Sequence, residues 1–122
     1  MKKIILFTRV PVVIGIIGIL SATIANSQSP NWQWAKSAGG TGVDEFRSVA
    51  TDNIGNVYVT GYFTSLITFG PFTLTDSGGG DIFIVKFDKN GNVLRAKSEG
   101  GTNWDESFGI AIDSSGNVYL TG

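Results

Sequence analysis

Adjacent carboxylates occur twice in this chain, and their type and spacing suggest catalysis more readily than any other feature. Asp44-Glu45 and Asp105-Glu106 are the only adjacent acidic pairs in the sequence. Two carboxylates that flank a glycosidic bond can serve as the acid and the base of sugar hydrolysis. The same side chains can instead cap turns at the beginning of strands. Because both pairs recur in a repeat, whereas a catalytic centre needs one asymmetric cluster, we expect them to be architectural.

One loop resembles the beginning of a calcium site. Residues 88–92 read D-K-N-G-N, and Glu99 stands at the twelfth position, where an EF-hand loop has its bidentate glutamate. The sixth position is Val93 instead of the required glycine, and residues 92–98 have the composition of a strand. We therefore expect a turn without a cofactor, with calcium as the alternative.

Other catalytic side chains and motifs are missing from the sequence. The chain has no histidine and no cysteine, which removes the commonest general base, the commonest metal ligand and all disulfides. It contains neither a G-x-S-x-G nucleophile motif nor a G-x-x-x-x-G-K-[ST] phosphate loop. We therefore predict that the chain is not an enzyme.

Three tryptophans carry the rings best suited to stack on a sugar. Trp104 differs from Trp32 and Trp34 because it replaces Val43 of the first repeat copy, so the repeat itself does not require it. This makes Trp104 the candidate ligand contact. The alternative is that the ring packs between neighbouring sheets.

The elements that would position these residues are organised as a repeat. Residues 35–61 align without gaps with residues 96–122, and 16 of the 27 positions are identical. Such units bury their apolar faces against copies of themselves, so we predict a repeat region over 28–122 with a dry seam between the copies. Because Gly122 matches Gly61, we expect a fragment whose main partners are further blades. A short protein that pairs its sheet edges with other chains is the alternative.

Three loops of the form D-x-x-G-N join the predicted strands. Aspartate accepts hydrogen bonds from amides of its own turn, and glycine supplies the positive φ that ends a short hairpin loop. The predicted turn residues are Asp52, Gly55, Asn56, Asp88, Gly91, Asn92, Asp113, Gly116 and Asn117.

The strand pattern predicts the fold class. No helical periodicity follows residue 27, and Asp81–Phe87 (D-I-F-I-V-K-F) is apolar on both faces, as in a sheet covered on two sides. Gly39-Gly40 and Gly100-Gly101 are expected to be crossings between sheets. A repeated four-stranded unit of this length is typical of a β-propeller. We predict an all-β fold of β-propeller blades, each a four-stranded antiparallel sheet, with one full blade plus half of a second after an N-terminal signal helix.

The order of motifs also resembles one family. W-A-K-S-x-G-G, D-E, D-x-x-G-N-V-Y-V-T-G and D-I-F-I-V-K-F-D-x-N-G-N-V, over Trp34 to Gly122, resemble the SBBP family of bacterial β-propeller repeats. The resemblance implies a secreted or cell-surface protein with several blades and no defining catalytic motif. One departure is Arg95, which stands in the second copy where the first has Trp34 and the family often has tryptophan.

The N-terminus has the layout of a secretory signal peptide. Lys2, Lys3 and Arg9 precede an uncharged apolar run over 10–20, and small residues follow. We predict a signal peptide over 1–27 with cleavage after Ser27; cleavage after Ala25 and an uncleaved anchor are alternatives. Contact with a membrane is expected only through this segment, and the lack of cysteine excludes a lipoprotein anchor.

The charge of the remaining chain limits its partners. Residues 28–122 hold six basic and ten acidic side chains, which gives a net charge of −4 and argues against nucleic acid. We predict a non-enzymatic scaffold or binding module, secreted or at the cell surface, with carbohydrate or protein as candidate partners. The alternatives are a fragment of an extracellular, carbohydrate-active propeller enzyme with its catalytic residues elsewhere, and an oligomer joined at sheet edges.

Overall fold

β-Strands are the only regular elements in residues 31–122, the part of the chain that the computed structural model describes. The predicted signal peptide lies outside these residues. Within them, no helix is long and apolar enough to cross a bilayer. The strands are β2 (Gly39–Gly40), β3 (Asp44–Thr51), β4 (Val57–Phe63), β5 (Leu66–Phe69), β6 (Phe72–Thr75), β7 (Asp81–Phe87), β8 (Val93–Glu99), β9 (Gly109–Ile112) and β10 (Val118–Thr121).

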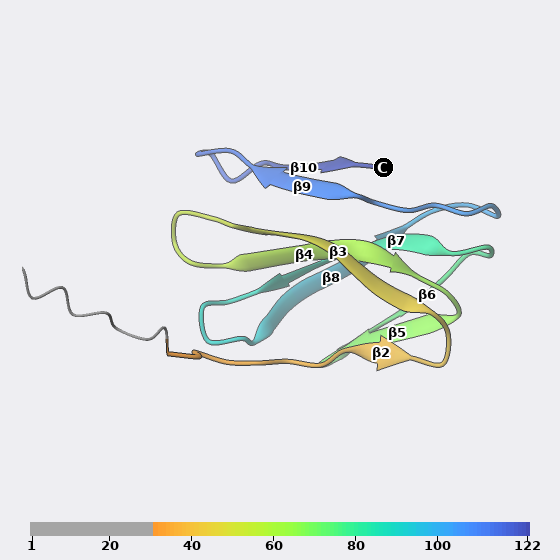
Figure 1. Cartoon of the computed structure of the whole chain (residues 1–122), viewed down its shortest axis with the longest axis horizontal. Helices are drawn as coiled ribbons and strands as arrows, with labels where there is room; N and C mark the ends of the chain where they lie inside the picture. The colour runs from red at the N-terminus through yellow and green to blue at the C-terminus, as the bar shows by residue number, and fades with distance from the viewer. Residues whose placement is uncertain (1–30) are drawn as a thin grey trace, which may run out of the picture. The chain divides into compact units, whose positions relative to one another are not determined.

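The predicted four-stranded antiparallel sheet is confirmed. It has the order β3-β4-β7-β8 and consists of two hairpins, each closed by a D-x-x-G-N turn. The hairpin β5–β6 is inserted between them and pairs with β2 in a separate three-stranded sheet. The second copy forms the hairpin β9–β10, which corresponds to β3–β4 of the first (Figure 1).

One face of the four-stranded sheet carries the core. Alternate residues of β7, beginning with Phe83 and Val85, point to this face and are buried together with Phe63, Ile67 and Phe69. Ile67 and Phe69 come from β5, so the inserted hairpin covers this face. Each fully buried aromatic or aliphatic side chain contributes about 1.5–3 kcal/mol relative to an exposed one. The core therefore fixes the position of the sheet that carries the candidate site.

The opposite face of the sheet is less completely covered. Ile82, Ile84 and Lys86 of β7 are half-buried, and the hairpin β9–β10 lies on this side, in contact with β3 and β4 (Figure 1). The expectation that Asp81–Phe87 is covered on both faces is thus met fully on one face and in part on the other.

One local feature goes beyond the sequence expectation, and another differs between the two repeat copies. Gly39-Gly40 is more than a crossing, because it forms β2 and pairs with Thr68 and Ile67. Residues 34–38 are not a strand, although residues 95–99, which match them in the repeat, lie in β8. Residues 95–99 pair with β7, whereas no strand of that kind precedes residues 34–38 in the described part of the chain.

Candidate binding site

The D-x-x-G-N turns frame the candidate site, and each is held by its own aspartate. In the first turn, Asp52 Oδ1 accepts hydrogen bonds from the amides of Ile54 and Asn56 at 3.1 and 2.9 Å. Asp52 Oδ2 accepts from the side-chain amide of Asn56 at 2.7 Å and from the hydroxyl of Tyr58 at 3.3 Å. Gly55 has a φ of 87°, and its amide donates to the carbonyl of Asp52.

The other two turns repeat this geometry. Asp88 Oδ1 accepts from the amides of Asn90 and Asn92 at 2.8 and 2.9 Å, and Asp113 Oδ1 accepts from the corresponding amides at 2.9 Å. Both oxygens of Asp88 are thus engaged by donors of the turn, which favours a turn over a calcium loop. Within residues 31–122, no three His, Cys, Asp or Glu side chains are grouped so that they could hold a metal ion.

The turn aspartates are more acidic than ordinary aspartates. The side-chain amides of Asn92 and Asn117 are the largest causes that lower the pKa of Asp88 and of Asp113. At Asp52 burial raises the pKa, but the hydrogen bonds from Asn56 and Ile54 outweigh it, so this pKa also lies below its usual value.

These pKa shifts predict a pH-dependent contribution of the turns to stability. A carboxyl whose pKa is depressed by folding stabilises the protein above the unfolded pKa of about 3.9, and this contribution is lost as the pH falls through the folded pKa. Asp88→Asn and Asp113→Asn should therefore destabilise the protein at neutral pH and have much smaller effects at about pH 2. Urea unfolding at both pH values measures this, with Asp76→Asn, outside the turns, as the control. Equal losses at both pH values would contradict it.

The adjacent acidic pairs also bond within the fold. Asp44 Oδ2 accepts from the amide of Gly40 at 2.8 Å, and Asp105 Oδ2 accepts from the amide of Gly101 at the same distance. The structure therefore places both aspartates as caps of the loop that precedes them.

The two glutamates of these pairs meet at one guanidinium. Arg47 Nη2 lies 3.2 Å from Glu45 Oε2 and 2.5 Å from Glu106 Oε1. Glu45 also accepts a hydrogen bond from the Tyr62 hydroxyl at 2.8 Å, which raises the pKa of that hydroxyl and keeps the donor protonated. The glutamates thus join the first copy to the second.

The seam between the copies contains polar contacts. The hydroxyls of Thr60 and Ser107 are buried and lie 2.6 Å apart, and Ser107 also donates to the carbonyl of Gly61 at 3.2 Å. Asp105 donates its amide to the carbonyl of Gly80. Ser107 stands where the first copy has Phe46, so hydroxyl groups contribute to this seam as well as apolar groups.

Trp104 packs against the seam on one side only. Its ring centroid lies 4.8 Å from that of Tyr62, and its indole nitrogen donates to Glu106 at 3.2 Å. The residue is nevertheless 52% exposed, so one part of the ring faces solvent. The geometry is compatible with both roles that the sequence suggests for this residue.

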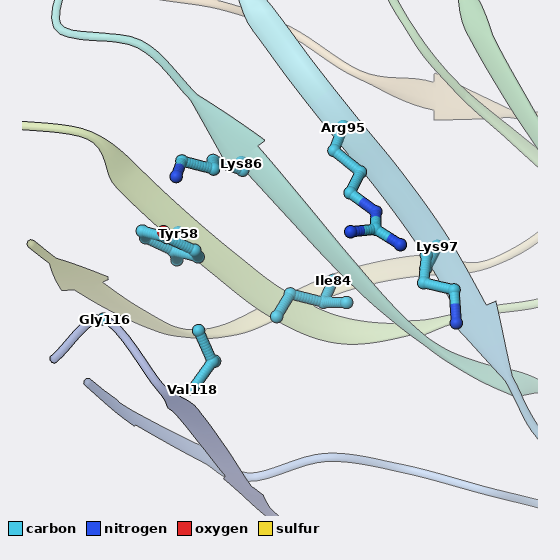
Figure 2. A pocket seen from close by; sticks show the side chains of 7 residues that line it. All are labelled: Tyr58, Ile84, Lys86, Arg95, Lys97, Gly116 and Val118. Atoms are coloured by element: carbon cyan, nitrogen blue, oxygen red, sulfur yellow. The ribbon is translucent and has the colours of Figure 1, made fainter. Parts of the chain in front are cut away.

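A groove that the sequence analysis does not identify lies between the less covered sheet face and β10. Figure 2 shows the residues around this cavity of about 330 Å³, which come from β4, β7 and β8 on one side and from β10 and the turn before it on the other. Its lining residues are Tyr58, Ile84, Lys86, Arg95, Lys97, Gly116 and Val118. The sequence held one sign of this groove. Arg95 and Lys97 stand two positions apart, and residues two apart in a strand share a face.

Comparison with known proteins shows which part of the chain matches a known repeat. Residues 100–122 match a family model described as the beta-propeller repeat, SBBP. The chain is also 29% identical over 96 residues to the uncharacterized WD repeat-containing protein L264 of Acanthamoeba polyphaga mimivirus. That match covers 73% of this chain but 7% of the viral protein, so the chain spans a small part of its relative. The match to the beta-propeller repeat thus falls on the hairpin β9–β10 and the loop before it, and this hairpin corresponds to β3–β4 of the four-stranded sheet.

Proposed function

We propose that this chain is a non-enzymatic module of an extracytoplasmic β-propeller, secreted or at the cell surface, that acts as a scaffold or binding module. The observation that carries the proposal is that the recurring carboxylates make hydrogen bonds and ion pairs within the fold. The turn aspartates bond to their own turns, Asp44 and Asp105 cap glycine amides, and the paired glutamates share Arg47. Carboxylates that a hydrolase would need for chemistry are thus engaged in hydrogen bonds and ion pairs within the fold.

The binding role is supported by positions at which the two copies differ. Residues that differ between the copies, such as Arg95 and Trp104, are exposed to solvent on a fixed frame. Further blades of the same protein, and carbohydrate or protein outside the cell, are the partners that fit this role.

The location can be tested with the native N-terminus. The full chain and a variant without residues 1–27 would be expressed in a Gram-negative bacterium and fractionated. The full chain should leave the cytoplasm and begin at Gln28, while the shortened variant stays inside. Recovery of both variants only in the cytoplasm would overturn the extracytoplasmic part of the proposal.

The non-enzymatic part needs a separate measurement. The purified chain would be incubated with a panel of chromogenic glycosides, next to Glu45→Gln and Glu106→Gln variants. We expect no turnover above the background of the buffer. Hydrolysis that disappears in a variant with an unchanged thermal midpoint would instead establish a glycosidase.

A further inference from the structure

Some of the residues at which the two repeat copies differ lie at the seam between them. The copies differ at 11 of 27 aligned positions, and three of the second-copy residues at these positions contact the first copy directly. These three seam residues are Trp104, which stands where the first copy has Val43, Ser107, which replaces Phe46, and Phe108, which replaces Arg47. The seam therefore joins two unlike surfaces, although the copies share most of their sequence.

Ser107 fills a site that admits only a small polar side chain. The residue is fully buried, and its hydroxyl oxygen lies 2.6 Å from that of Thr60 and 3.2 Å from the carbonyl oxygen of Gly61. Thr60 is equally buried, and its hydroxyl oxygen lies 2.6 Å from the carbonyl oxygen of Phe83. The backbone of the four-stranded sheet thus stands directly behind this contact. A phenyl ring, which Phe46 would supply at this position, would overfill the site and remove the hydroxyl that bonds to Thr60.

Phe108 gives Arg47 an uncharged neighbour. The guanidinium carbon of Arg47 lies 5.9 Å from the ring centroid of Phe108 and 5.5 Å from that of Tyr62. At such distances a cation is attracted to the face of an aromatic ring. The first copy has Arg47 itself at the position of Phe108, so a seam between two first copies would bring two guanidinium groups together. Because like charges repel, such a seam would be less stable.

Trp104 supplies contacts that valine cannot make. Its ring centroid lies 4.8 Å from that of Tyr62, and a Cβ added to Gly80 would lie 3.3 Å from the Trp104 ring. Its indole nitrogen donates to Glu106, the glutamate that forms an ion pair with Arg47. The valine that the first copy has at this position offers neither an aromatic ring nor a side-chain donor.

Residues that the copies share also join the seam, but they cannot distinguish one copy from the other. Asp105 donates its amide to the carbonyl of Gly80, and Glu106 pairs with Arg47. The first copy has the same two residue types, Asp and Glu, at the matching positions. The shared residues thus attach a copy, while the three seam residues differ according to which copy is attached.

We propose that the surface of the first copy formed by Arg47, Thr60 and Tyr62 is a selective docking surface. It accepts a repeat copy that carries the three seam residues of the second copy, and it excludes a copy that carries the residues of the first. The surface therefore fixes the order in which the two kinds of copy stand next to each other. This inference goes beyond the proposed function and does not depend on where the protein is located or on what it binds.

The test replaces residues of the second copy by their first-copy counterparts in the full chain. The seam variant carries Trp104→Val, Ser107→Phe and Phe108→Arg. The control variant carries Ser114→Asn and Ser115→Ile, which give an exposed turn of the second copy the residues of the first turn. Amide hydrogen exchange of β9 and β10, followed by NMR, measures docking, because a two-stranded hairpin is only marginally stable by itself in water.

We expect exchange in β9 and β10 to become at least about tenfold faster in the seam variant and to change less than about twofold in the control variant. The amides that join β4 to β7 should stay protected in both. Equal exchange rates of β9 and β10 in the two variants would overturn the proposal.

A single exposed position decides the matter if the seam variant also loses protection in β4 and β7. Phe108 is 61% exposed, so its replacement leaves the core intact. Phe108→Arg should speed exchange in β9 and β10 at least about threefold more than Phe108→Leu, because only arginine places a second cation beside Arg47. The difference between these two variants should disappear when each is combined with Arg47→Gln. Equal effects of Phe108→Arg and Phe108→Leu, or a difference that persists without Arg47, would show that the surface does not discriminate in this way.

Discussion

Replacement of Phe83 by alanine is expected to destabilise the fold by about 3–5 kcal/mol, the usual range for a fully buried phenylalanine. The side chain of Phe83 is fully buried in the core. The centroid of its ring lies 5.1 Å from that of Phe69 and 5.4 Å from that of Phe46. Alanine would leave a cavity at the place where the inserted hairpin meets the four-stranded sheet. Because small domains have only about 5–15 kcal/mol of net stability, the variant should be largely unfolded under mild heating.

Urea unfolding followed by intrinsic fluorescence measures this loss. Phe108→Ala is the matched control, because it is the same substitution at a residue that is 61% exposed. The control should cost less than about 1 kcal/mol, since it removes little buried surface. Similar losses in the two variants would mean that the core is not centred on Phe83.

The second large effect is expected at Gly61, where the backbones of β3 and β4 approach closely. A Cβ added to Gly61 would lie 1.8 Å from the carbonyl oxygen of Glu45. The obstacle is backbone rather than a flexible side chain, and the strands pair on both sides of it, with a bulge between Phe46 and Ser48. Gly61→Ala should therefore destabilise the protein by about 3 kcal/mol or more, because the sheet must shift.

A second glycine separates crowding from loss of flexibility. Gly116 has a φ of 85° but has no atom within 4 Å of an added Cβ. Gly116→Ala should destabilise the protein by only about 1–2 kcal/mol, because alanine disfavours the left-handed backbone conformation at this position. Denaturation of the two variants side by side checks the difference. If Gly116→Ala were the more damaging change, steric crowding at Gly61 would be less costly than the left-handed backbone at Gly116.

The hairpins could be predicted from the sequence because their signals are local. Each D-x-x-G-N loop contains both the acceptor and the donors of its own hydrogen bonds, so five residues specify the turn. The apolar residues on both faces of Asp81–Phe87 likewise predict a strand covered on two sides, which the structure shows fully on one face and in part on the other.

Features that depend on distant partners could not be predicted in this way. Two glycines carry no side-chain pattern, so nothing in Gly39-Gly40 indicates pairing with β5. The polar seam depends on Thr60 meeting Ser107, 47 residues further along the chain. The groove depends on the register of β7 and β8, which shifts at an irregularity next to Lys86 and sets which cations stand opposite each other.

The self-contained turns have a consequence for how such a protein can change. The two variable positions of each loop, such as Ile54, extend from a frame that the flanking Asp, Gly and Asn hold by themselves. Ile54 is 78% exposed, so its side chain contributes little to the interior. Substitutions at these two positions can therefore change the side chains at each loop tip independently. The same scaffold can acquire new binding specificities while its fold stays unchanged.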